Sequence, residues 1–386
     1  MKKYKFLLLL FNIAILPFLF LLSCIARFIP KKIDVGLGPE PLINNVYHKL
    51  AIAKKGYSVE TFVRGVYIIT SDFDIRWDLK FPGLLLAIRD QVMFIYGIFR
   101  YKLQIFYFNG GCLGFTPLLW RLEFILLKIA KVKTILMPYG IDIQELTRCN
   151  NLSFKHMLSL DYPAHRFNRK IVKDKIDMWT RNADHVISGC DWVDYMYQWD
   201  TLMLAHFSIN LDDWVPVESI PHDKVRILHA PNHRNIKGTR FIIEAIESII
   251  KEGYPVEFKL LEKVPNKIIR EALEWCDIAI DQLIIGWYAM FAIEAMSLGK
   301  PTICYLRDDL YKLYYEAGIV KKDEIPLVRS DTSTIKQVLL ELILDASNRK
   351  RIGDHSRKFV EKYHSLDAVG LIFDSIIKKL LKTNIK

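Results

Sequence analysis

Apolar residues along the chain form three successive patterns. Residues 6–25 are an apolar run broken only by Asn12, Pro17 and Ser23, and a run of that length spans a bilayer core as a helix. After it, short β-branched runs that end in glycine alternate with segments of helical period, first over residues 31–215 and again over residues 216–362. This alternation is typical of parallel sheets with helices on both faces.

In the first alternating region, β-branched runs predict strands and one-sided apolar spacing predicts helices. The strands are expected at residues 32–37, 57–63, 66–70, 103–111, 132–140 and 183–189. The helices are expected at residues 42–56 and 118–131. Residues 209–223, with two prolines and four acids, have the composition of a linker.

The second alternating region repeats the architecture without repeating the sequence. Its strands are expected at residues 225–230, 256–264, 277–281 and 301–306. Its helices are expected at residues 239–253, with Thr239 as the cap, at 265–276, with Pro265 in the first turn, and at 288–298, 334–346 and 348–363.

These patterns predict an α/β fold with two doubly wound, Rossmann-like domains that face each other across a cleft, preceded by an N-terminal membrane helix. The expected boundaries are 1–30 for the anchor, 31–215 for the N-terminal domain and 216–362 for the C-terminal domain. Residues 363–386 are expected to form a helix with a basic tail that returns to the N-terminal domain.

The apolar run at residues 6–25 is interpreted as a retained membrane anchor. A cleaved signal peptide is an alternative, although no small-x-small cleavage site follows and the run is long for such a peptide. A lipoprotein signal at Leu21-Leu22-Ser23-Cys24 is another, but a bulky leucine stands there where a small residue is usual. Three positive residues precede the run and three follow it, so charge does not decide its orientation. Pro17 leaves open a bent segment that enters and leaves on one face, so that both single-pass and monotopic anchors fit.

Composition narrows the class of protein. The 386 residues are enough for two domains, and 51% hydrophobic with 25% charged residues indicates a globular chain. The net charge is 54 − 43 = +11, which favours anionic partners such as phosphorylated small molecules or acidic lipid. The charge is spread out and no recognition motif appears, which disfavours nucleic acid. The six scattered cysteines form no CxxC pair and no His cluster has metal-ligand spacing, so we expect reduced thiols and no metal site.

Two stretches in the second region place chemistry at strand ends, where ligands bind in doubly wound sheets. In HAPNHRNIKGT, Arg234 and Lys237 flank a turn that enters a helix, an arrangement that suits a diphosphate, although an exposed basic loop would look the same. In DIAIDQLIIGWYAMFAIEAMSLGKPTI, Glu294 lies among apolar residues two turns into a helix. A carboxylate there can accept hydrogen bonds from two vicinal hydroxyls, or it can pair with a basic core residue.

Taken together, these stretches resemble the C-terminal domain of B-fold glycosyltransferases, and in particular the family-4-like group that uses nucleotide sugars. DASNRKRIGDHSRKFVEKYHS resembles the closing helices of that family, and VGLGPEPLINNVYHKLAIAKKGYSVETFV resembles its glycine loop and first helix. The resemblance covers most of residues 33–365. It implies a sugar transferred from a nucleotide diphosphate to an acceptor hydroxyl, with retention of configuration, no metal and no other cofactor.

The resemblance also implies roles for individual residues. Arg234 and Lys237 would hold the diphosphate on the C-terminal, donor side, and Glu294 would bind the ribose. Further donor contacts are predicted at His229, Gly238, Gln282, Gly286, Trp287 and Tyr288. On the N-terminal, acceptor side, the cleft residues would be Gly36, Gly38, Asn44 and Asp142.

One departure from the family concerns the donor sugar. The family carries two glutamates separated by seven residues, and eight positions before Glu294 stands Gly286. This substitution motivates an alternative, a catalytically inactive scaffold or nucleotide-sugar-binding protein. A B-fold sugar-nucleotide epimerase is a further alternative, although the carboxylates expected of one were not found in the sequence. The expected partners are a nucleotide sugar, a glycan or lipid-linked acceptor, and the membrane. Because nucleotide sugars are made in the cytosol, we expect the domains on the cytosolic face.

Overall fold

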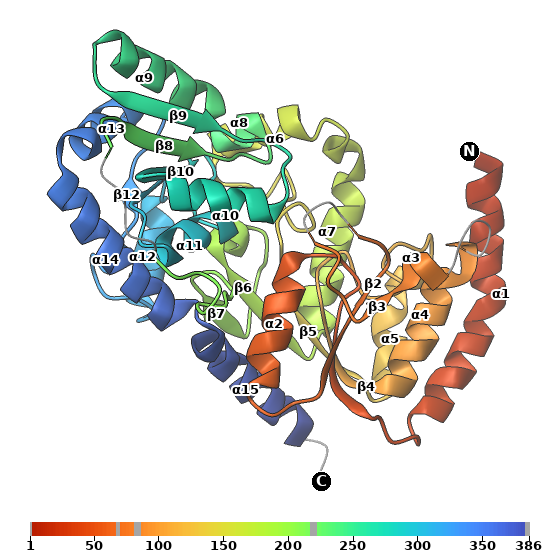
Figure 1. Cartoon of the computed structure of the whole chain (residues 1–386). Coiled ribbons are helices and arrows are strands. Elements are labelled where there is room, and N and C mark those ends of the chain that lie inside the picture. The colour runs from red at the N-terminus through yellow and green to blue at the C-terminus, as the bar shows by residue number, and fades with distance from the viewer. Residues whose placement is uncertain (1, 67–69, 81–85, 217–221, 383–386) are drawn as a thin grey trace.

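A computed structural model describes residues 2–66, 70–80, 86–216 and 222–382. Within these ranges the chain forms two parallel sheets, each covered by helices, and this confirms the α/β prediction (Figure 1). An N-terminal helix, α1 (Lys2–Ala26), lies at one side of the molecule.

The first sheet has the order β3-β2-β1-β4-β5-β6-β7 in the described part of the chain, and its neighbouring strands are parallel. Its strands are β1 (Ile33–Leu37), β2 (Val59–Val63), β3 (Ile75–Arg76), β4 (Tyr101–Phe106), β5 (Lys133–Leu136), β6 (His185–Gly189) and β7 (Thr201–Met203). The order reverses between β1 and β4, so the loops that follow these two strands diverge and leave room for a ligand.

Helices cover both faces of this sheet. The helices in this half are α2 (Ile43–Ala53), α3 (Trp77–Lys80), α4 (Leu86–Arg100), α5 (Glu123–Ile129), α6 (Leu152–Asp161) and α7 (His165–Asn182), with the 3₁₀ turns η2 (Leu119–Arg121) and η3 (Cys190–Asp194). Of these, α6 packs against residues 234–237 of the other half. The helix predicted at residues 118–131 is thus divided into η2 and α5. The strand predicted at residues 66–70 falls largely on residues 67–69, outside the described residues.

The second sheet has the order β12-β11-β10-β8-β9 among the described residues. Its strands are β8 (Val225–His229), β9 (Val256–Leu260), β10 (Ile278–Gln282), β11 (Thr302–Cys304) and β12 (Val328–Arg329). Its helices are α8 (Arg234–Lys237), α9 (Thr239–Lys251), α10 (Asn266–Trp275), α11 (Met290–Ser297), α12 (Asp308–Glu316), α13 (Ile335–Leu344) and α14 (Ala346–Tyr363). The order reverses between β8 and β10.

The start of α9 differs from the prediction. Gly238 is the cap, in the left-handed conformation with φ of 74°, and Thr239 is the first helical residue. The Thr239 hydroxyl is bonded to the ring of His229 instead of capping the helix.

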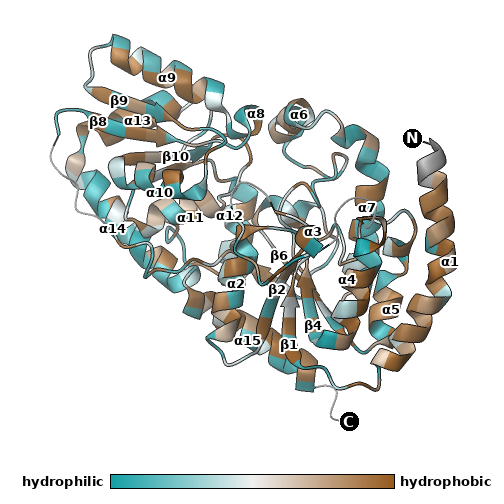
Figure 2. Cartoon of the chain, turned by 45° about the vertical axis from the view of Figure 1, so that its right-hand side comes forward, coloured by the Kyte–Doolittle hydropathy of each residue, from teal (hydrophilic) through white to brown (hydrophobic). Residues whose placement is uncertain are grey.

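Helix α1 packs along α4 and α5 (Figures 1 and 2). A narrow stripe of Asn12, Leu19, Ser23 and Ala26 is buried, and Asn12 accepts a hydrogen bond from the backbone of Leu118 at 3.4 Å. The exposed surface carries large apolar side chains, namely Phe6, Leu7, Leu10, Ile13, Phe18, Phe20, Leu21 and Ile25. Residues 6–26 are long and apolar enough to cross a membrane. An ordinary surface helix turns its apolar side chains towards the protein and its polar ones towards water. In α1 the arrangement is reversed, because Asn12 and Ser23 face the protein and the large apolar side chains are exposed.

The chain crosses between the two sheets twice, at adjacent points. On the first crossing, the amide of Ile209 donates to the carbonyl of His364 at 2.9 Å. On the second, His364 leads into α15 (Leu366–Lys382), which lies against α2. Val369 and Phe373 of α15 share one core with Val35 of β1. The last helix therefore belongs by packing to the first sheet.

Candidate functional site

A cavity of about 190 Å³ lies at the carboxyl ends of β8 and β10, where the strand order of the second sheet reverses. We call it the β8–β10 cavity. It is lined by Ile43 from the first half of the chain and by Ala230, Pro231, Asn232, Lys237, Leu261, Lys263, Val264, Asn266, Ile269, Ala289, Met290, Phe291 and Glu294. Lys237 and Glu294 therefore face one ligand-sized space, as the sequence predicts.

Glu294 projects from α11 into this cavity and is 3% exposed. Its Oε1 accepts a hydrogen bond from the side-chain amide of Asn266 at 2.8 Å. Burial raises the pKa of Glu294 to about 7, the Asn266 hydrogen bond lowers it, and the nearby Asp281 carboxylate raises it. A neutral amide does not balance the charge, so this carboxylate can accept further hydrogen bonds from a ligand.

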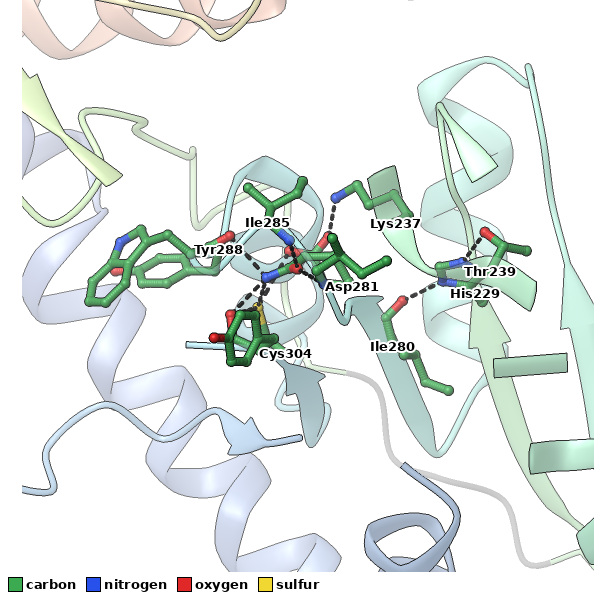
Figure 3. Close-up of polar contacts among 12 residues, drawn as sticks. His229, Lys237, Thr239, Ile280, Asp281, Ile285, Tyr288 and Cys304 are labelled. Atoms are coloured by element: carbon green, nitrogen blue, oxygen red, sulfur yellow. Dashed lines mark hydrogen bonds and ion pairs between the residues drawn. The ribbon is translucent and has the colours of Figure 1, made fainter. Parts of the chain in front are cut away.

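Lys237 lies at the C-terminal end of α8, and its ammonium contacts the Asp281 carboxylate at 2.5 Å (Figure 3). The Asp281 side chain is almost wholly buried and that of Lys237 is 15% exposed. The pair holds the lysine nitrogen at the mouth of the cavity, where it keeps two further N–H donors.

The amino-terminal end of α11 closes another wall of the cavity through Ala289, Met290 and Phe291. The cap residue, Ala289, supplies no side-chain acceptor to the first N–H groups of this helix. Unpaired N–H groups at a helix start attract an anion, and Lys237 adds a formal positive charge to the same space.

A second cavity, of about 250 Å³, lies between the two halves of the chain, and we call it the interdomain cavity. Its N-terminal wall includes Tyr139, Gln144, Tyr162, Asp191 and Trp192, and its C-terminal wall includes His233, Ile285, Trp287 and Tyr288. Asn232, Lys237 and Ala289 line both cavities, so the two spaces meet at Lys237.

Arg234 and Lys237, which were predicted to hold one anion together, line different pockets in the structure. Arg234 lines a different surface pocket and forms a bidentate ion pair with Glu262, at 2.8 and 2.6 Å. The ion pair with Asp281 directs the Lys237 side chain towards the cavity. The ion pair with Glu262, which lies beyond the end of β9, directs the Arg234 side chain away from it.

His229 and Gln282 were predicted to contact the donor, but the structure gives both a role inside the protein. Both ring nitrogens of the buried His229 are engaged, one with the carbonyl of Ile280 and the other with the Thr239 hydroxyl, each at 2.9 Å (Figure 3). The buried Gln282 accepts from the amides of Ile284 and Ile285, at 2.7 Å each. It thereby fixes the loop between β10 and α11.

The three residues that follow in this loop shape it differently. Gly286 has φ of 101°, and a Cβ there would lie 2.6 Å from the Arg307 side chain, so only glycine fits. Trp287 donates its indole N–H to the carbonyl of Leu204 at 2.7 Å, and the Tyr288 hydroxyl meets His364 at 3.0 Å. Both rings line the interdomain cavity, and both are held by contacts to the segments that join the halves.

The residues predicted on the N-terminal side divide into packing residues and one candidate. A Cβ on Gly36 would lie 2.6 Å from the Tyr101 ring, and one on Gly38 would lie 2.0 Å from the carbonyl of Phe62. Asp142 accepts three backbone hydrogen bonds, from Phe108, Tyr139 and Gly140. These contacts are internal to the N-terminal half, and a ligand contact at these three residues stays a prediction.

Asn44 remains a candidate. It lies in the first turn of α2, next to the cavity-lining Ile43, and is 6% exposed. Its Oδ1 has no hydrogen-bond partner among the described residues.

Sequence reasoning missed Asn266 and Asp191. Asn266 could not be linked to Glu294 because the two residues belong to different helices, α10 and α11. Asp191 lies two positions after the predicted strand at residues 183–189, so the strand-end rule could have found it. No group of three or more His, Cys, Asp or Glu side chains in the described ranges could hold a metal ion, and a reaction without metal stays a prediction.

Comparison with solved structures identifies the fold. The chain is similar to sucrose-phosphate synthase from Thermosynechococcus elongatus, with 14% identity, a TM-score of 0.58, and 91% of this chain and 100% of that chain covered. It is similar to a glycosyltransferase from Rickettsia africae, with 13% identity, a TM-score of 0.54, and 91% and 99% covered. It is also similar to a putative UDP-N-acetylglucosamine 2-epimerase from Listeria monocytogenes, with 14% identity, a TM-score of 0.50, and 92% and 98% covered.

No protein-family model matches the chain, and no curated protein matches it. The structural comparisons show that it has the B fold of glycosyltransferases, as the sequence motifs predict. At these identities the likeness concerns the fold.

Proposed function

We propose that the protein is a glycosyltransferase that moves a sugar from a nucleotide-diphosphate sugar to an acceptor hydroxyl. The observation that carries the proposal is the convergence of Lys237, the start of α11 and Glu294 in one cavity at the reversal point of the second sheet. The fold shared with glycosyltransferases supports the reaction class.

Each of the three groups matches one part of a nucleotide sugar. The Glu294 carboxylate accepts hydrogen bonds from the two ribose hydroxyls, which replace the water lost on burial. The diphosphate binds between the Lys237 ammonium and the N–H groups at the start of α11. The sugar then extends past Lys237 into the interdomain cavity, where the acceptor enters from the N-terminal side.

The chemical step breaks the bond between the sugar and the diphosphate. Negative charge develops on the departing phosphate oxygen, and the fixed positive charge of Lys237 stabilises it. Confinement between the two halves positions donor and acceptor for transfer. Retention of configuration and independence of metal are part of the proposal, and they rest on the resemblance of the motifs.

We further propose that α1 attaches the protein to the cytosolic face of a membrane and lies in the plane of the interface, in the synthesis of a lipid-linked or envelope glycan. If α1 crossed the bilayer, Leu118, whose amide bonds to Asn12 within the span, would lie at hydrocarbon depth, and exposed Arg121 close to it would cost about 3 kcal/mol. Lying flat, α1 buries its exposed apolar surface in lipid, and Arg27 and Lys32, which follow the helix and are exposed, meet anionic headgroups.

Nucleotide binding is the first test. The full-length chain in detergent is screened by thermal shift against UDP, GDP, ADP, CMP and their sugars, with Glu294→Ala beside the wild type. We expect one nucleotide family to stabilise the wild type and to lose its effect in the variant. Glu262→Ala is a matched control, because this acid lies outside the cavity and pairs with Arg234. The proposal fails if no nucleotide binds, or if Glu294→Ala binds like the wild type. Binding without any sugar release would favour the inactive scaffold.

The in-plane position of α1 is tested by labelling. Cysteines introduced at Lys3 and Lys32 should both react with an impermeant thiol reagent from the same side of a vesicle. Reaction from opposite sides would show a membrane-crossing helix instead.

A further inference from the structure

The start of helix α7 projects from the body of the protein. Residues 166–171 are all exposed, and among residues 165–173 only His165 and Val172 are buried. The side chains of Phe167 and Ile171 are 76% and 41% exposed, and a spacing of four residues places them on one side of the helix. These two side chains add nothing to the core, so this part of α7 has the form of a contact surface.

The same two turns carry a strong positive charge. Residues 162–173 contain no acidic residue. Their cations are Arg166, Arg169, Lys170 and Lys173. Arg166 lies 4.7 Å from the centre of the Phe167 ring, and the nearest acid to Arg169 is Glu145, at 3.9 Å. The two lysines have no acidic partner within the described part of the chain. Exposed apolar side chains surrounded by basic ones are typical of a helix that lies on an anionic membrane.

Helix α7 lies beside α5, on which α1 packs. The ring of Trp179 in α7 lies 5.0 Å from that of Phe106 in β4 and 6.5 Å from that of Phe124 in α5. The beginnings of α1 and α7 lie at the same end of the first half of the chain (Figures 1 and 2). A membrane that covers the exposed side of α1 can therefore also meet the start of α7.

The start of α7 is also tied to the interdomain cavity. The ring of His165 is hydrogen-bonded to the carbonyl of Gln144 at 2.6 Å, and Gln144 and Tyr162 both line that cavity. Five residues lead from Tyr162 to Phe167, and a chain of that length spans at most about 17 Å. A membrane in contact with Phe167 therefore lies close to the N-terminal wall of the cavity.

We propose that the start of α7 is a second membrane contact, in which Phe167 and Ile171 enter the headgroup layer and the surrounding cations bind anionic lipid. The inference rests on the attachment by α1 that is part of the proposed function. Helix α1 holds the protein at the bilayer, and the contact at α7 fixes the rotation of the protein about α1. The interdomain cavity then lies next to the lipid surface, so an acceptor embedded in lipid can reach it.

An anionic bilayer fits this surface better than a second copy of the chain does. A symmetric contact between two copies would place the cations of both helices against each other, and each copy carries a net charge of +11. On an anionic membrane each cation instead increases the affinity about fivefold.

The test measures lipid contact in the full-length chain. Cys24 is replaced by serine, because the other five cysteines are buried, and Phe167→Cys is labelled with an NBD fluorophore. The protein is added to phosphatidylcholine vesicles with or without phosphatidylserine. With phosphatidylserine we expect the NBD emission to increase and move to shorter wavelength, and lipid brominated on its acyl chains should quench it.

Two variants sharpen this test. Changing Arg166, Lys170 and Lys173 to glutamine should lower the ratio of lipid-contacting to free label about 100-fold, since three fivefold contributions are lost. Ile250→Cys is the matched control, because Ile250 is 47% exposed but lies on α9 of the other half, far from α1 (Figure 1). Its label should respond to neither kind of vesicle. If Phe167→Cys does not fold, Ile171→Cys reports on the same surface.

Three results would overturn the inference. The first is a label on α7 that responds to anionic vesicles no more than the label on α9 does. The second is an equal response to neutral vesicles, which would exclude a role for anionic lipid. The third is a response that follows protein concentration without lipid, which would show a contact between two copies.

Flotation of the protein with neutral vesicles separates this inference from the proposal on which it rests. If the protein floats with them and the label on α7 stays silent on anionic vesicles, only the contact at α7 is refuted. If the protein does not float with neutral vesicles, attachment by α1 is refuted, and the inference fails with it.

Discussion

Replacing Glu294 with glutamine should stabilise the empty protein and weaken its ligand binding. The glutamine keeps the shape of the side chain and removes a charge that is 3% exposed and bonded to one neutral amide. The folded state raises the pKa of Glu294 from 4.5 to about 7, and each pKa unit corresponds to about 1.4 kcal/mol. The full difference is therefore about 3 kcal/mol of unfolding free energy.

The pH dependence follows from where the proton is held. Between pH 4.5 and 7 the unfolded chain loses the Glu294 proton while the folded chain retains it, so the stability of the wild type falls as pH rises. Above pH 7 the folded state carries the buried charge and the whole cost. The substituted glutamine cannot ionise, so the advantage of the variant should be near zero at pH 4 and reach about 3 kcal/mol at pH 8. For a chain of 386 residues this corresponds to about 4 °C in melting temperature.

The assay is thermal unfolding of both proteins between pH 4 and pH 8, without and with nucleotide. With saturating nucleotide the advantage of the variant at pH 8 should shrink by about 1.4–2.7 kcal/mol, because losing a hydrogen bond to a charged acceptor weakens binding by about 10- to 100-fold. Asn266→Ala is the control, since it removes the hydrogen bond that lowers the Glu294 pKa but leaves the acid in place. Stability curves of Glu294→Gln and wild type that run parallel across this range would refute the reasoning.

Two further predictions concern neighbouring residues. Lys237→Ala should abolish nucleotide binding and cost about 3–5 kcal/mol of stability, because it leaves the Asp281 carboxylate buried without its cation. Arg234→Ala breaks an exposed ion pair, so it should have little effect on stability and leave nucleotide affinity unchanged. Equal effects of the two substitutions, measured by denaturation and nucleotide titration, would contradict the assignment. Gly286→Ala should lower the melting temperature by several degrees, since its Cβ meets Arg307 and its φ is 101°, and a melting curve that matches the wild type would show that the loop rearranges freely.

The sequence was most informative where a rule of strand topology applied. Strands β8 and β10 were recognisable from their β-branched runs, and residues beyond their ends, Lys237 and Glu294, do share a cavity. The direction in which a side chain points was harder to predict from the sequence. Arg234 is turned outward by Glu262, which belongs to a distant segment, and no local pattern reveals that pairing.

Residues at the very ends of strands posed the same difficulty. His229 and Gln282 both end strands, and their side chains could equally face a ligand or the protein. Their partners, Thr239, Ile284 and Ile285, become visible only when the adjoining loops are folded. The burial of Asn12 and Ser23 in α1 was likewise hidden, because the sequence shows a nearly uniform apolar run and the helices that cover these two residues lie far along the chain.

The paired crossings at Ile209 and His364 limit how the two halves can move. The two crossing segments lie side by side and are joined by a hydrogen bond, so together they act as one hinge. The two halves can rotate about this hinge but cannot separate there. Because α15, which follows the second crossing, packs on the first sheet, the two halves should open and close by a single rotation about this hinge. Substrate binding and product release would then depend on the same opening motion, so a stiffer hinge would slow both steps.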